Sequence, residues 1–361
     1  MDWGLFHNIL VAHSIRAFIY HALSSQGIPI PENCLNRLKQ HALQAGFNSL
    51  HQFKILTELL KELEQQGIRA IPYKGVCLAS CYYDSISARE SSDIDLLVAP
   101  EDVKRTRLFF HKKGYEPKAD FPEGYLNYVL KHFKEITFKS PKDSLHINCT
   151  VEVQWKLLDR YFGEFANYHF FSPHTEVYQY NNQSYNRLKP AYDFLCVASN
   201  HLLKEPLFSF KYAIDLACIM QKENVAINSD EIMAPIQQLG AEDLFFAGLQ
   251  TVEALLGIQA HPGQKAEYNK QLLENAIAFP PKQKEKQISF KSIEAYLAFD
   301  KSRLRKSRRK LRIFQYWLAP NIAEINDLKL PFALMPLLFI YRPFKLVWKF
   351  LRVQTALQRS S

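Results

Sequence analysis

Ser92-Asp93-Ile94-Asp95-Leu96-Leu97-Val98 is the stretch of sequence that decides the fold of this chain. Its apolar run predicts a short strand that ends before Pro100. Because side chains alternate along a strand, Asp93 and Asp95 would project from one face while the apolar residues beside them enter a core. Two like charges on one face repel, so the spacing favours a bound cation. The alternative is a solvated strand face, since an Asp-x-Asp pattern alone is a weak signal.

The residues before this strand predict a helix, a strand and a turn. A helix that ends near Gly67 is predicted by leucines at helical spacing: Leu56, Leu59, Leu60 and Leu63. Residues 68–73 then predict a strand, and a helix over Val76–Tyr83 follows the Lys74-Gly75 turn. Gly75 would allow backbone amides to approach a phosphate, and the helix N-terminus favours anions. Lys74 would add a positive charge; the alternative is a surface lysine at a turn.

The residues after this strand complete a small sheet. Glu101–Lys113 predicts a helix closed by Gly114, and Glu135–Phe138 predicts a strand. A further strand is predicted over Ile147–Gln154, where apolar and polar residues alternate and Glu152 lies on the polar face. The order of elements predicts an α+β fold: a small mixed sheet with flanking helices and a mostly helical C-terminal domain.

We expect three regions along the chain. Residues 1–65 form an N-terminal helical segment, 66–160 form the sheet-containing core, and 161–361 form a mostly helical C-terminal domain with a basic end. Within the last region, Ala191–His201 and Phe210–Gln221 predict packed helices, and Pro280-Pro281 predicts a loop.

Composition places the chain among ordinary globular proteins. It has 361 residues, of which 47% are hydrophobic and 22% charged, and only 12 are glycine, which excludes repetitive and disordered classes. The net charge of +9 favours an anionic partner: nucleotide phosphates, nucleic acid or an acidic membrane surface. Six cysteines in this length do not predict a disulfide framework. Without a signal peptide or a long apolar span, we expect a cytoplasmic protein, with peripheral membrane contact as an addition.

The motifs resemble a known family. Ile71-Pro72-Tyr73-Lys74-Gly75, Arg89, Ser92–Val98 and Gly114-Tyr115 look like the uncharacterised nucleotidyltransferase family 5, of the polymerase-β-like superfamily. The resemblance implies that two carboxylates on one strand and a third on a neighbouring strand bind Mg²⁺, with Mn²⁺ as the alternative. Asp93 and Asp95 match the first two, and Glu152 matches the third.

The chain departs from the family pattern at Gln154 and from the pattern of the wider superfamily at Lys74-Gly75. Gln154 stands where relatives tend to have histidine after the third acid, and glutamine cannot titrate. Lys74-Gly75 replaces the usual Gly-Ser phosphate turn of the superfamily. The resemblance extends weakly to His201 and Asp215 on predicted helices, which would lie near the nucleotide.

Arg89 has two interpretations. It would contact a phosphate, or it would form a structural salt bridge with Glu90 or Asp84. His201 and Asp215 also have a structural alternative, because paired or capping groups on helices are common.

These residues predict a metal-dependent nucleotidyltransferase. It would move a nucleoside monophosphate from an NTP to an acceptor, which is a small molecule, a protein or an RNA. Asp93, Asp95 and Glu152 would hold the metal, while Lys74, Gly75, Arg89, His201 and Asp215 would bind the nucleotide. The alternative is a catalytically inactive nucleotide- or partner-binding protein anchored to an anionic surface by its basic C-terminal part. Neither the preferred base nor the oligomeric state is indicated.

The C-terminal part is basic and aromatic. Lys301–Lys310 contains seven basic residues in ten, which suits phosphate or anionic lipid. Helical spacing also puts four apolar residues on one face: Phe344, Val347, Trp348 and Leu351. We expect this face to dock on the domain, with the lysines in water; the alternative is an interfacial helix.

Overall fold

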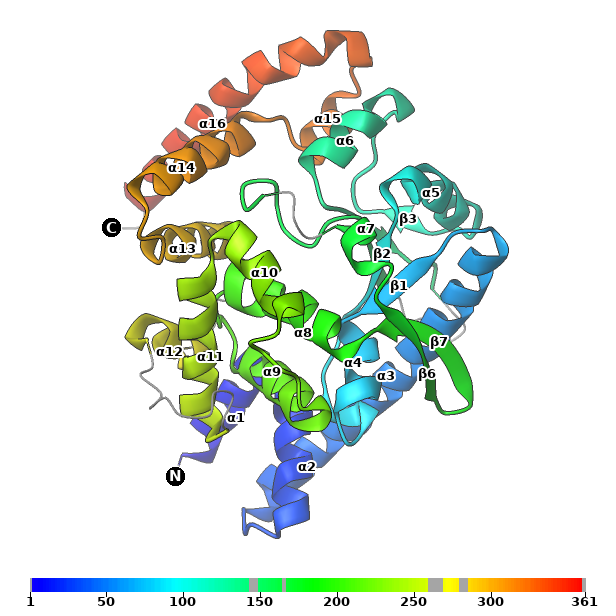
Figure 1. Cartoon of the computed structure of the whole chain (residues 1–361), viewed down its shortest axis with the longest axis vertical. Helices are drawn as coiled ribbons and strands as arrows, with labels where there is room; N and C mark the ends of the chain where they lie inside the picture. The colour runs from blue at the N-terminus through cyan, green and yellow to red at the C-terminus, as the bar shows by residue number, and fades with distance from the viewer. Residues whose placement is uncertain (1, 143–148, 164–166, 259–268, 279–284, 359–361) are drawn as a thin grey trace.

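A computed structural model describes residues 2–142, 149–163, 167–258, 269–278 and 285–358 (Figure 1). The fold is mixed α+β, as predicted: one sheet and one hairpin stand beside a helical C-terminal part. The strands of the sheet are β1 (Ala70–Tyr73), β2 (Asp93–Val98), β3 (Glu116–Pro117), β4 (Glu135–Lys139) and β5 (Thr150–Gln154). The hairpin consists of β6 (Thr175–Tyr180) and β7 (Gln183–Leu188).

Helices flank the sheet in the N-terminal half of the chain, and helices make up most of the C-terminal half. Those of the N-terminal half are α1 (Trp3–His13), α2 (Arg16–Gln26), α3 (Glu32–Gln65), α4 (Gly75–Tyr82), α5 (Val103–Lys112), α6 (Leu126–His132) and α7 (Tyr168–Phe171). Those of the C-terminal half are α8 (Pro190–Ala198), α9 (Phe210–Glu223), α10 (Asp230–Leu239), α11 (Glu242–Leu256), α12 (Lys270–Ile277), α13 (Glu285–Ala298), α14 (Arg303–Leu318), α15 (Ile322–Leu328) and α16 (Met335–Gln358). Short 3-10 turns occupy η1 (Ile86–Ala88), η2 (Pro100–Asp102), η3 (Glu123–Tyr125) and η5 (Phe332–Leu334), and η4 (Ser199–Lys204) is a π-helical turn.

The sheet has the strand order β1-β2-β5-β4-β3, and its register aligns polar residues in a row. β2 is antiparallel to β1 and parallel to β5. Tyr73 is opposite Asp95, and Asp95 is opposite Glu152. Residues that face each other across neighbouring strands lie on the same side of the sheet. The register therefore puts these three side chains next to one another.

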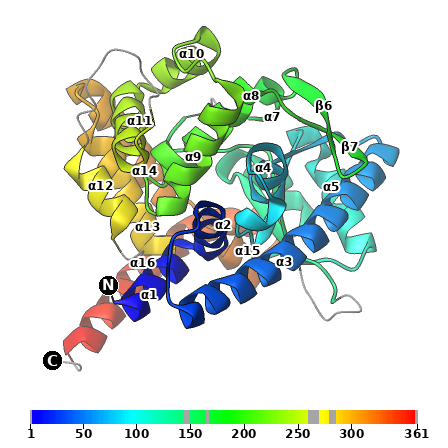
Figure 2. The same cartoon turned by 90° about the horizontal axis from the view of Figure 1, so that it is seen from below.

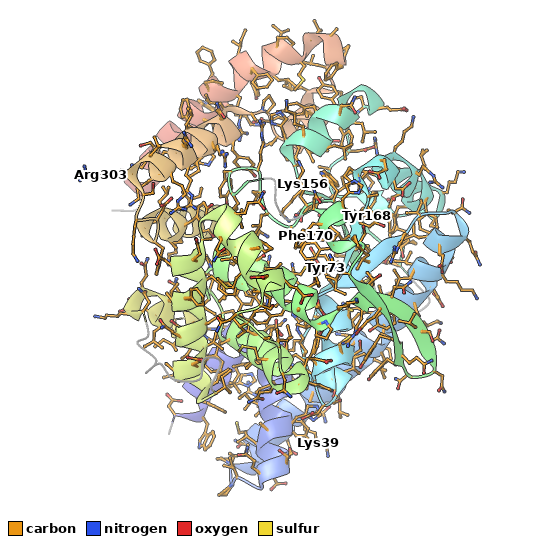
Figure 3. The ribbon with its side chains drawn as sticks, in the orientation of Figure 1. Lys39, Tyr73, Lys156, Tyr168, Phe170 and Arg303 are labelled. Carbon is orange, nitrogen blue, oxygen red and sulfur yellow. The ribbon has the colours of Figure 1, made fainter. Side chains whose placement is uncertain are left out.

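The alternation predicted for the two central strands is confirmed. Ile94, Leu96, Val151 and Val153 are buried in the core, as is Cys149. Residues 147 and 148 of the predicted strand and the predicted Pro280-Pro281 loop lie outside the described residues. The six cysteines are free thiols, as composition predicted. Figure 3 shows Tyr73 in the interior, whereas Lys39 and Arg303 point outward.

One predicted helix ends earlier than expected. The α-helix of Ala191–His201 stops at Ala198, and the chain continues as the π-helical turn η4. The amide of Glu205 donates to the carbonyl of Asn200, five residues earlier, at 2.8 Å. A π turn is wider than an α turn and is often found at functional sites. This turn faces the sheet-side site described below.

The C-terminal helices α14 and α16 contact each other, and α16 projects from the body of the molecule (Figure 2). The expected docking of the aromatic face of α16 is wrong for two of its residues. The side chains of Phe344 and Trp348 are 71% and 56% exposed. Val347 and Leu351 carry no described side chains. Among the helices of the described ranges, none combines the length and apolar character needed to cross a bilayer.

Packing between α5 and the sheet gives a first prediction. The Phe110 ring is fully buried, stacks on Phe138 at 4.8 Å and meets Tyr115 edge-on at 5.0 Å. We expect Phe110→Ala to lower the free energy of unfolding by about 3–5 kcal/mol, because a large cavity replaces the ring. Leu108→Ala on the same helix removes a side chain that is 53% exposed. It should change the free energy by less than about 0.5 kcal/mol in urea unfolding. Equal effects would contradict this packing.

Candidate active site

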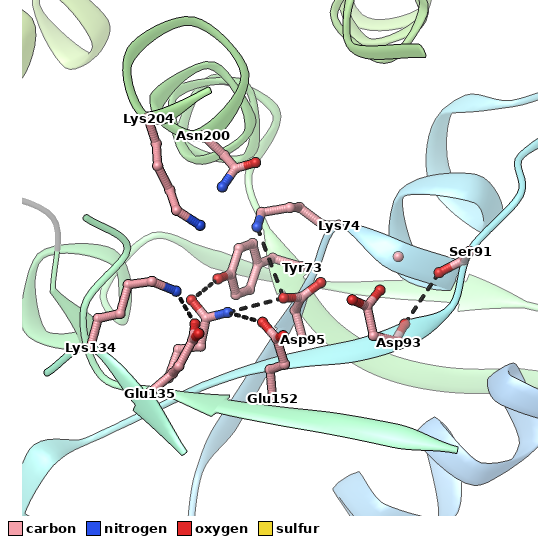
Figure 4. A network of polar contacts seen from close by, with 12 residues as sticks. Tyr73, Lys74, Ser91, Asp93, Asp95, Lys134, Glu135, Glu152, Asn200 and Lys204 are labelled. Atoms are coloured by element: carbon pink, nitrogen blue, oxygen red, sulfur yellow. Dashed lines mark hydrogen bonds and ion pairs between the residues drawn. The ribbon is translucent and has the colours of Figure 1, made fainter. Parts of the chain in front are cut away.

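Three carboxylates meet on one face of the central strands. Asp93 and Asp95 lie two residues apart on β2, and Glu152 lies on β5 opposite Asp95. All three line one cavity of about 250 Å³ (Figure 4). Asp95 is buried, whereas Asp93 and Glu152 are half-buried. The strand geometry thus brings together the three acids that the sequence predicted as metal ligands.

The side-chain amide of Gln154 connects two of these acids. Its Nε2 donates to Asp95 Oδ1 at 3.0 Å and to Glu152 Oε2 at 2.9 Å. The hydroxyl of Tyr73 donates to the amide oxygen of Gln154, which fixes the amide orientation. Gln154 is fully buried, so this orientation is held by packing as well. A glutamine at this position therefore acts as a donor that holds two carboxylates close together.

The electrostatics of Asp95 reflect this crowding. Burial, together with the nearby charges of Asp93 and Glu152 and against the opposing effect of Lys74, raises the pKa of Asp95 to about 7. Lys74 Nζ lies 3.9 Å from Asp95 Oδ1. One lysine near three carboxylates leaves an excess of negative charge at this end of the cavity. A bound cation would remove that excess.

The Lys74-Gly75 turn has an unusual backbone. Lys74 has φ +50° and Gly75 has φ +45°, in a region that favours glycine. A Cβ on Gly75 would lie 2.8 Å from the carbonyl oxygen of Asp93. Glycine is therefore required for the start of α4 to approach β2 closely. The strained conformation of Lys74 is of the kind that concentrates at functional sites.

A second set of polar residues completes the cavity from the helical part of the chain. The π turn η4 and the residue after it contribute Asn200, Lys204 and Glu205, and α9 contributes Lys211 and Tyr212. In Figure 4, the side chains of Asn200, Lys204 and Lys74 point toward the space above the carboxylates. The cavity is therefore negative on the strand side and carries amino groups on the opposite side.

The lysines of this region have different charge environments. Burial disfavours charge on Lys204, but Glu205 at 3.5 Å, together with Asp159 and Glu152, outweighs it and raises the pKa of Lys204 above its usual value. Burial lowers the pKa of Lys211 to about 8 and that of Lys134 to about 7. Lys134 lies beside the cavity and pairs with Glu135. Lys204 is therefore the most strongly basic of these three lysines.

Arg89, His201 and Asp215 form one buried network behind the cavity. Asp215 accepts from Arg89 Nε at 2.7 Å and Nη2 at 2.9 Å, from His201 Nε2 at 2.9 Å and from the Tyr83 hydroxyl at 2.5 Å. Burial opposes ionisation of Asp215, but Arg89 holds the pKa of this carboxyl well below its usual range. Burial lowers the pKa of His201. The carboxylate of Asp215 is fully occupied by these donors.

The network also reaches the Lys74-Gly75 turn. Arg89 Nη1 donates to the carbonyl of Gly75 at 3.0 Å. Of the two salt bridges that sequence suggested for Arg89, neither is formed; its partner is Asp215, and Glu90 pairs with Arg16 at 2.5 Å. Arg89 and His201 line the cavity, whereas Asp215 does not. Asp215 thus lies behind the cavity and supports two residues that line it.

The site has the chemistry that a divalent cation requires. Its candidate ligands are carboxylate oxygens, which hard cations such as Mg²⁺ prefer. Within the described ranges, no three His, Cys, Asp or Glu side chains form a preformed metal cage. Magnesium usually binds one or two carboxylates together with substrate phosphates and water, so a preformed cage is not needed. The buried, crowded carboxyl of Asp95 fits such an ion.

A family model and a solved structure match parts of this chain. A family model described as an uncharacterised nucleotidyltransferase matches residues 1–257. Among solved structures, the crystal structure of an antigenic nucleotidyltransferase-like protein from Paracoccidioides brasiliensis is 13% identical. The match covers 52% of this chain and 87% of that chain, with a TM-score of 0.32. No curated protein matches the sequence.

The pKa of Asp95 yields a stability prediction. This pKa is about 7 in the folded protein and about 4 in the unfolded chain, so the folded state binds the extra proton between these values. The free energy of unfolding of the metal-free protein should therefore fall as pH rises from 4 to 7. Asp95→Asn keeps an oxygen acceptor for Gln154 and removes the charge. The variant should be more stable than wild type near pH 8, by on the order of 4 kcal/mol for this pKa difference.

Urea unfolding in EDTA near pH 5 and pH 8 measures this difference. Asp84→Asn, which neutralises an exposed carboxylate, is the control and should follow the wild type. If Asp95→Asn and wild type lost stability equally between the two pH values, the crowded-carboxylate description would be wrong.

Proposed function

The chain belongs to the uncharacterised nucleotidyltransferase family whose model matches residues 1–257, and we propose that it is an active, metal-dependent enzyme. It moves a nucleoside monophosphate from an NTP to an acceptor hydroxyl or phosphate and releases pyrophosphate. The acceptor is a small molecule, a partner protein or an RNA. The observation that carries this proposal is the co-facial set of Asp93, Asp95 and Glu152 opposite the amino groups of Lys74 and Lys204.

The carboxylate side of the cavity suits a metal ion, and the lysine side suits the pyrophosphate that leaves. Asp93 and Asp95, with Glu152, would hold Mg²⁺ or Mn²⁺. When bound, the cation supplies neutralisation of phosphate charge and polarises the reacting phosphoryl group. Lys74 and Lys204 carry positive charge toward the pyrophosphate that leaves. Gly75 lets the start of α4 approach a phosphate, because it has no side chain.

An acceptor hydroxyl loses its proton in this reaction, and the site contains carboxylates that would accept it. The acceptor oxygen forms a bond to the α-phosphorus, and the bond from that phosphorus to the pyrophosphate oxygen breaks. The proton passes to Asp95 or Glu152. Both side chains are carboxylates on the cation side of the cavity, where a general base for the acceptor would act. Arg89 and His201 both bond to Asp215, and this network holds the Lys74-Gly75 turn and η4 in place.

A double substitution tests the proposal. Asp93→Asn, Asp95→Asn should reduce Mg²⁺-dependent pyrophosphate release from the preferred NTP by at least about a hundredfold, because the charge that holds the cation is gone. The control, Asp84→Asn, Glu101→Gln, removes two exposed carboxylates outside the cavity and should keep full activity. Folding of both variants is checked by circular dichroism. Full turnover by the double Asn variant would refute the assignment.

A second candidate function rests on two other observations. Gln154 bridges Asp95 and Glu152, at the position where the family resemblance implies a titratable histidine. The C-terminal helices also expose large apolar side chains beside basic ones, including Phe314 on α14 and Ile340 and Phe344 on α16. Together they support a catalytically inactive nucleotide- or partner-binding protein held at an anionic membrane surface. Metal-dependent nucleotide binding without pyrophosphate release would favour this function.

Membrane contact is tested directly with vesicles. We expect the protein to sediment with vesicles that contain phosphatidylglycerol more strongly than with neutral vesicles, and less as salt rises. Phe344→Ser, Trp348→Ser should weaken sedimentation, because both side chains are exposed apolar surface. Val177→Ser, which removes an equally exposed side chain on β6, is the control. Sedimentation that is the same for both variants would argue against membrane contact through α16.

A further inference from the structure

A separate cavity of about 900 Å³ lies beside α14. Five arginines line it: Arg160, Arg305, Arg308, Arg309 and Arg312. No aspartate or glutamate is among the described residues that line it. None of these described residues also lines the cavity that contains Asp93 and Asp95. The positive charge of the Lys301–Lys310 segment is therefore partly directed into a concave site.

Two of the five arginines build the wall of this cavity. Arg309 is buried, donates to the carbonyls of Leu239 at 2.6 Å and Gly240 at 2.9 Å, and lies 3.8 Å from the ring centre of Tyr296. Arg309 and Arg305 share one buried carboxylate, Asp300, at 2.7 and 3.1 Å. These contacts give Arg305 and Arg309 a structural role. They also leave the pair with one negative charge for two positive charges.

The other three arginines have no carboxylate partner within the part of the chain that the structure describes. Arg308 and Arg312 lie one turn apart on α14 and are exposed at the cavity. Arg160 contacts the ring of His132, with Nη1 at 3.1 Å from Nδ1. Burial, reinforced by Arg160, lowers the pKa of His132 to about 4, so this histidine is neutral at physiological pH. Arg160 therefore lines the cavity beside a neutral ring and not beside a carboxylate.

We infer that this cavity binds a small molecule that carries two or more phosphate groups. Guanidinium groups form paired hydrogen bonds to phosphate oxygens, and three such groups without carboxylates match several phosphates better than one. A concave space of this volume is the size of small-molecule sites. A polynucleotide would instead use charge spread along the outer face of α14, on which Arg303 points away from the body (Figure 3). This inference does not depend on the proposed nucleotidyl transfer.

The test uses inorganic tripolyphosphate as the probe, in EDTA, with binding measured by isothermal titration of the full chain. The variant Arg308→Gln, Arg312→Gln removes two charges that have no carboxylate partner among the described residues and leaves the structural arginines of the cavity intact. The matched control, Arg303→Gln, Lys310→Gln, removes two exposed charges from the same helix, and neither residue lines the cavity. A third variant, Lys74→Gln, Lys204→Gln, removes the amino groups of the carboxylate cavity.

We expect the Arg308, Arg312 variant to bind tripolyphosphate at least about tenfold more weakly than wild type, because two charge-assisted contacts are lost. The Arg303, Lys310 control should stay within about threefold of wild type, since it loses only long-range attraction. The Lys74, Lys204 variant should retain this binding. Unchanged melting temperatures establish that the variants are folded.

Two results would overturn the inference. Equal weakening by both α14 variants, together with binding of a short RNA that they weaken equally, would assign the charge of α14 to a polynucleotide. Loss of tripolyphosphate binding in the Lys74, Lys204 variant alone would place the anion in the carboxylate cavity. Neither result bears on nucleotide turnover, which the double Asn variant of β2 tests separately.

Discussion

The parallel pairing of β2 with β5 is the constraint on which the site depends. Its register puts Asp95 opposite Glu152, and the strand alternation puts Asp93 on the same face. Three carboxylates are thereby held close together, with Asp95 buried among them. A protein that needed only stability would gain from a neutral residue here, because burial and like charges both oppose ionisation. The arrangement makes physical sense as a site for a cation and an anionic substrate.

The rest of the fold holds positively charged side chains close to the three carboxylates of β2 and β5. Asp215 on α9 joins Arg89, His201 and Tyr83, and Arg89 in turn holds the carbonyl of Gly75. One buried carboxylate thus connects the helical part to the turn that carries Lys74. Removing one partner of such a buried pair would leave an uncompensated charge, at a cost of about 3–5 kcal/mol. The network explains why the two sides of the cavity form one unit.

Local patterns predicted how the residues on the strand side of the candidate site are arranged. Asp93, Asp95, Lys74 and Gly75 lie within one strand-turn-helix-strand stretch, where side-chain alternation and glycine geometry have direct consequences. Long-range pairing could not be predicted in this way: the Arg89–Asp215 bond joins residues 126 positions apart. The π turn that brings Asn200 and Lys204 to the cavity carries no simple sequence signal. The β6–β7 hairpin was missed although Asn181-Asn182, both at positive φ, is a turn signal between alternating residues.

We propose that the carboxylates of β2 and β5 hold a divalent cation together with a nucleoside triphosphate. A crystal structure with Mn²⁺ and a non-hydrolysable NTP analogue, with manganese located by its anomalous scattering, tests it most directly. We predict a manganese peak about 2.0–2.2 Å from oxygens of Asp93 and Asp95, with the triphosphate extending toward Lys74 and Lys204. A nucleotide bound elsewhere, or a fully occupied nucleotide with no manganese at these carboxylates, would contradict the account.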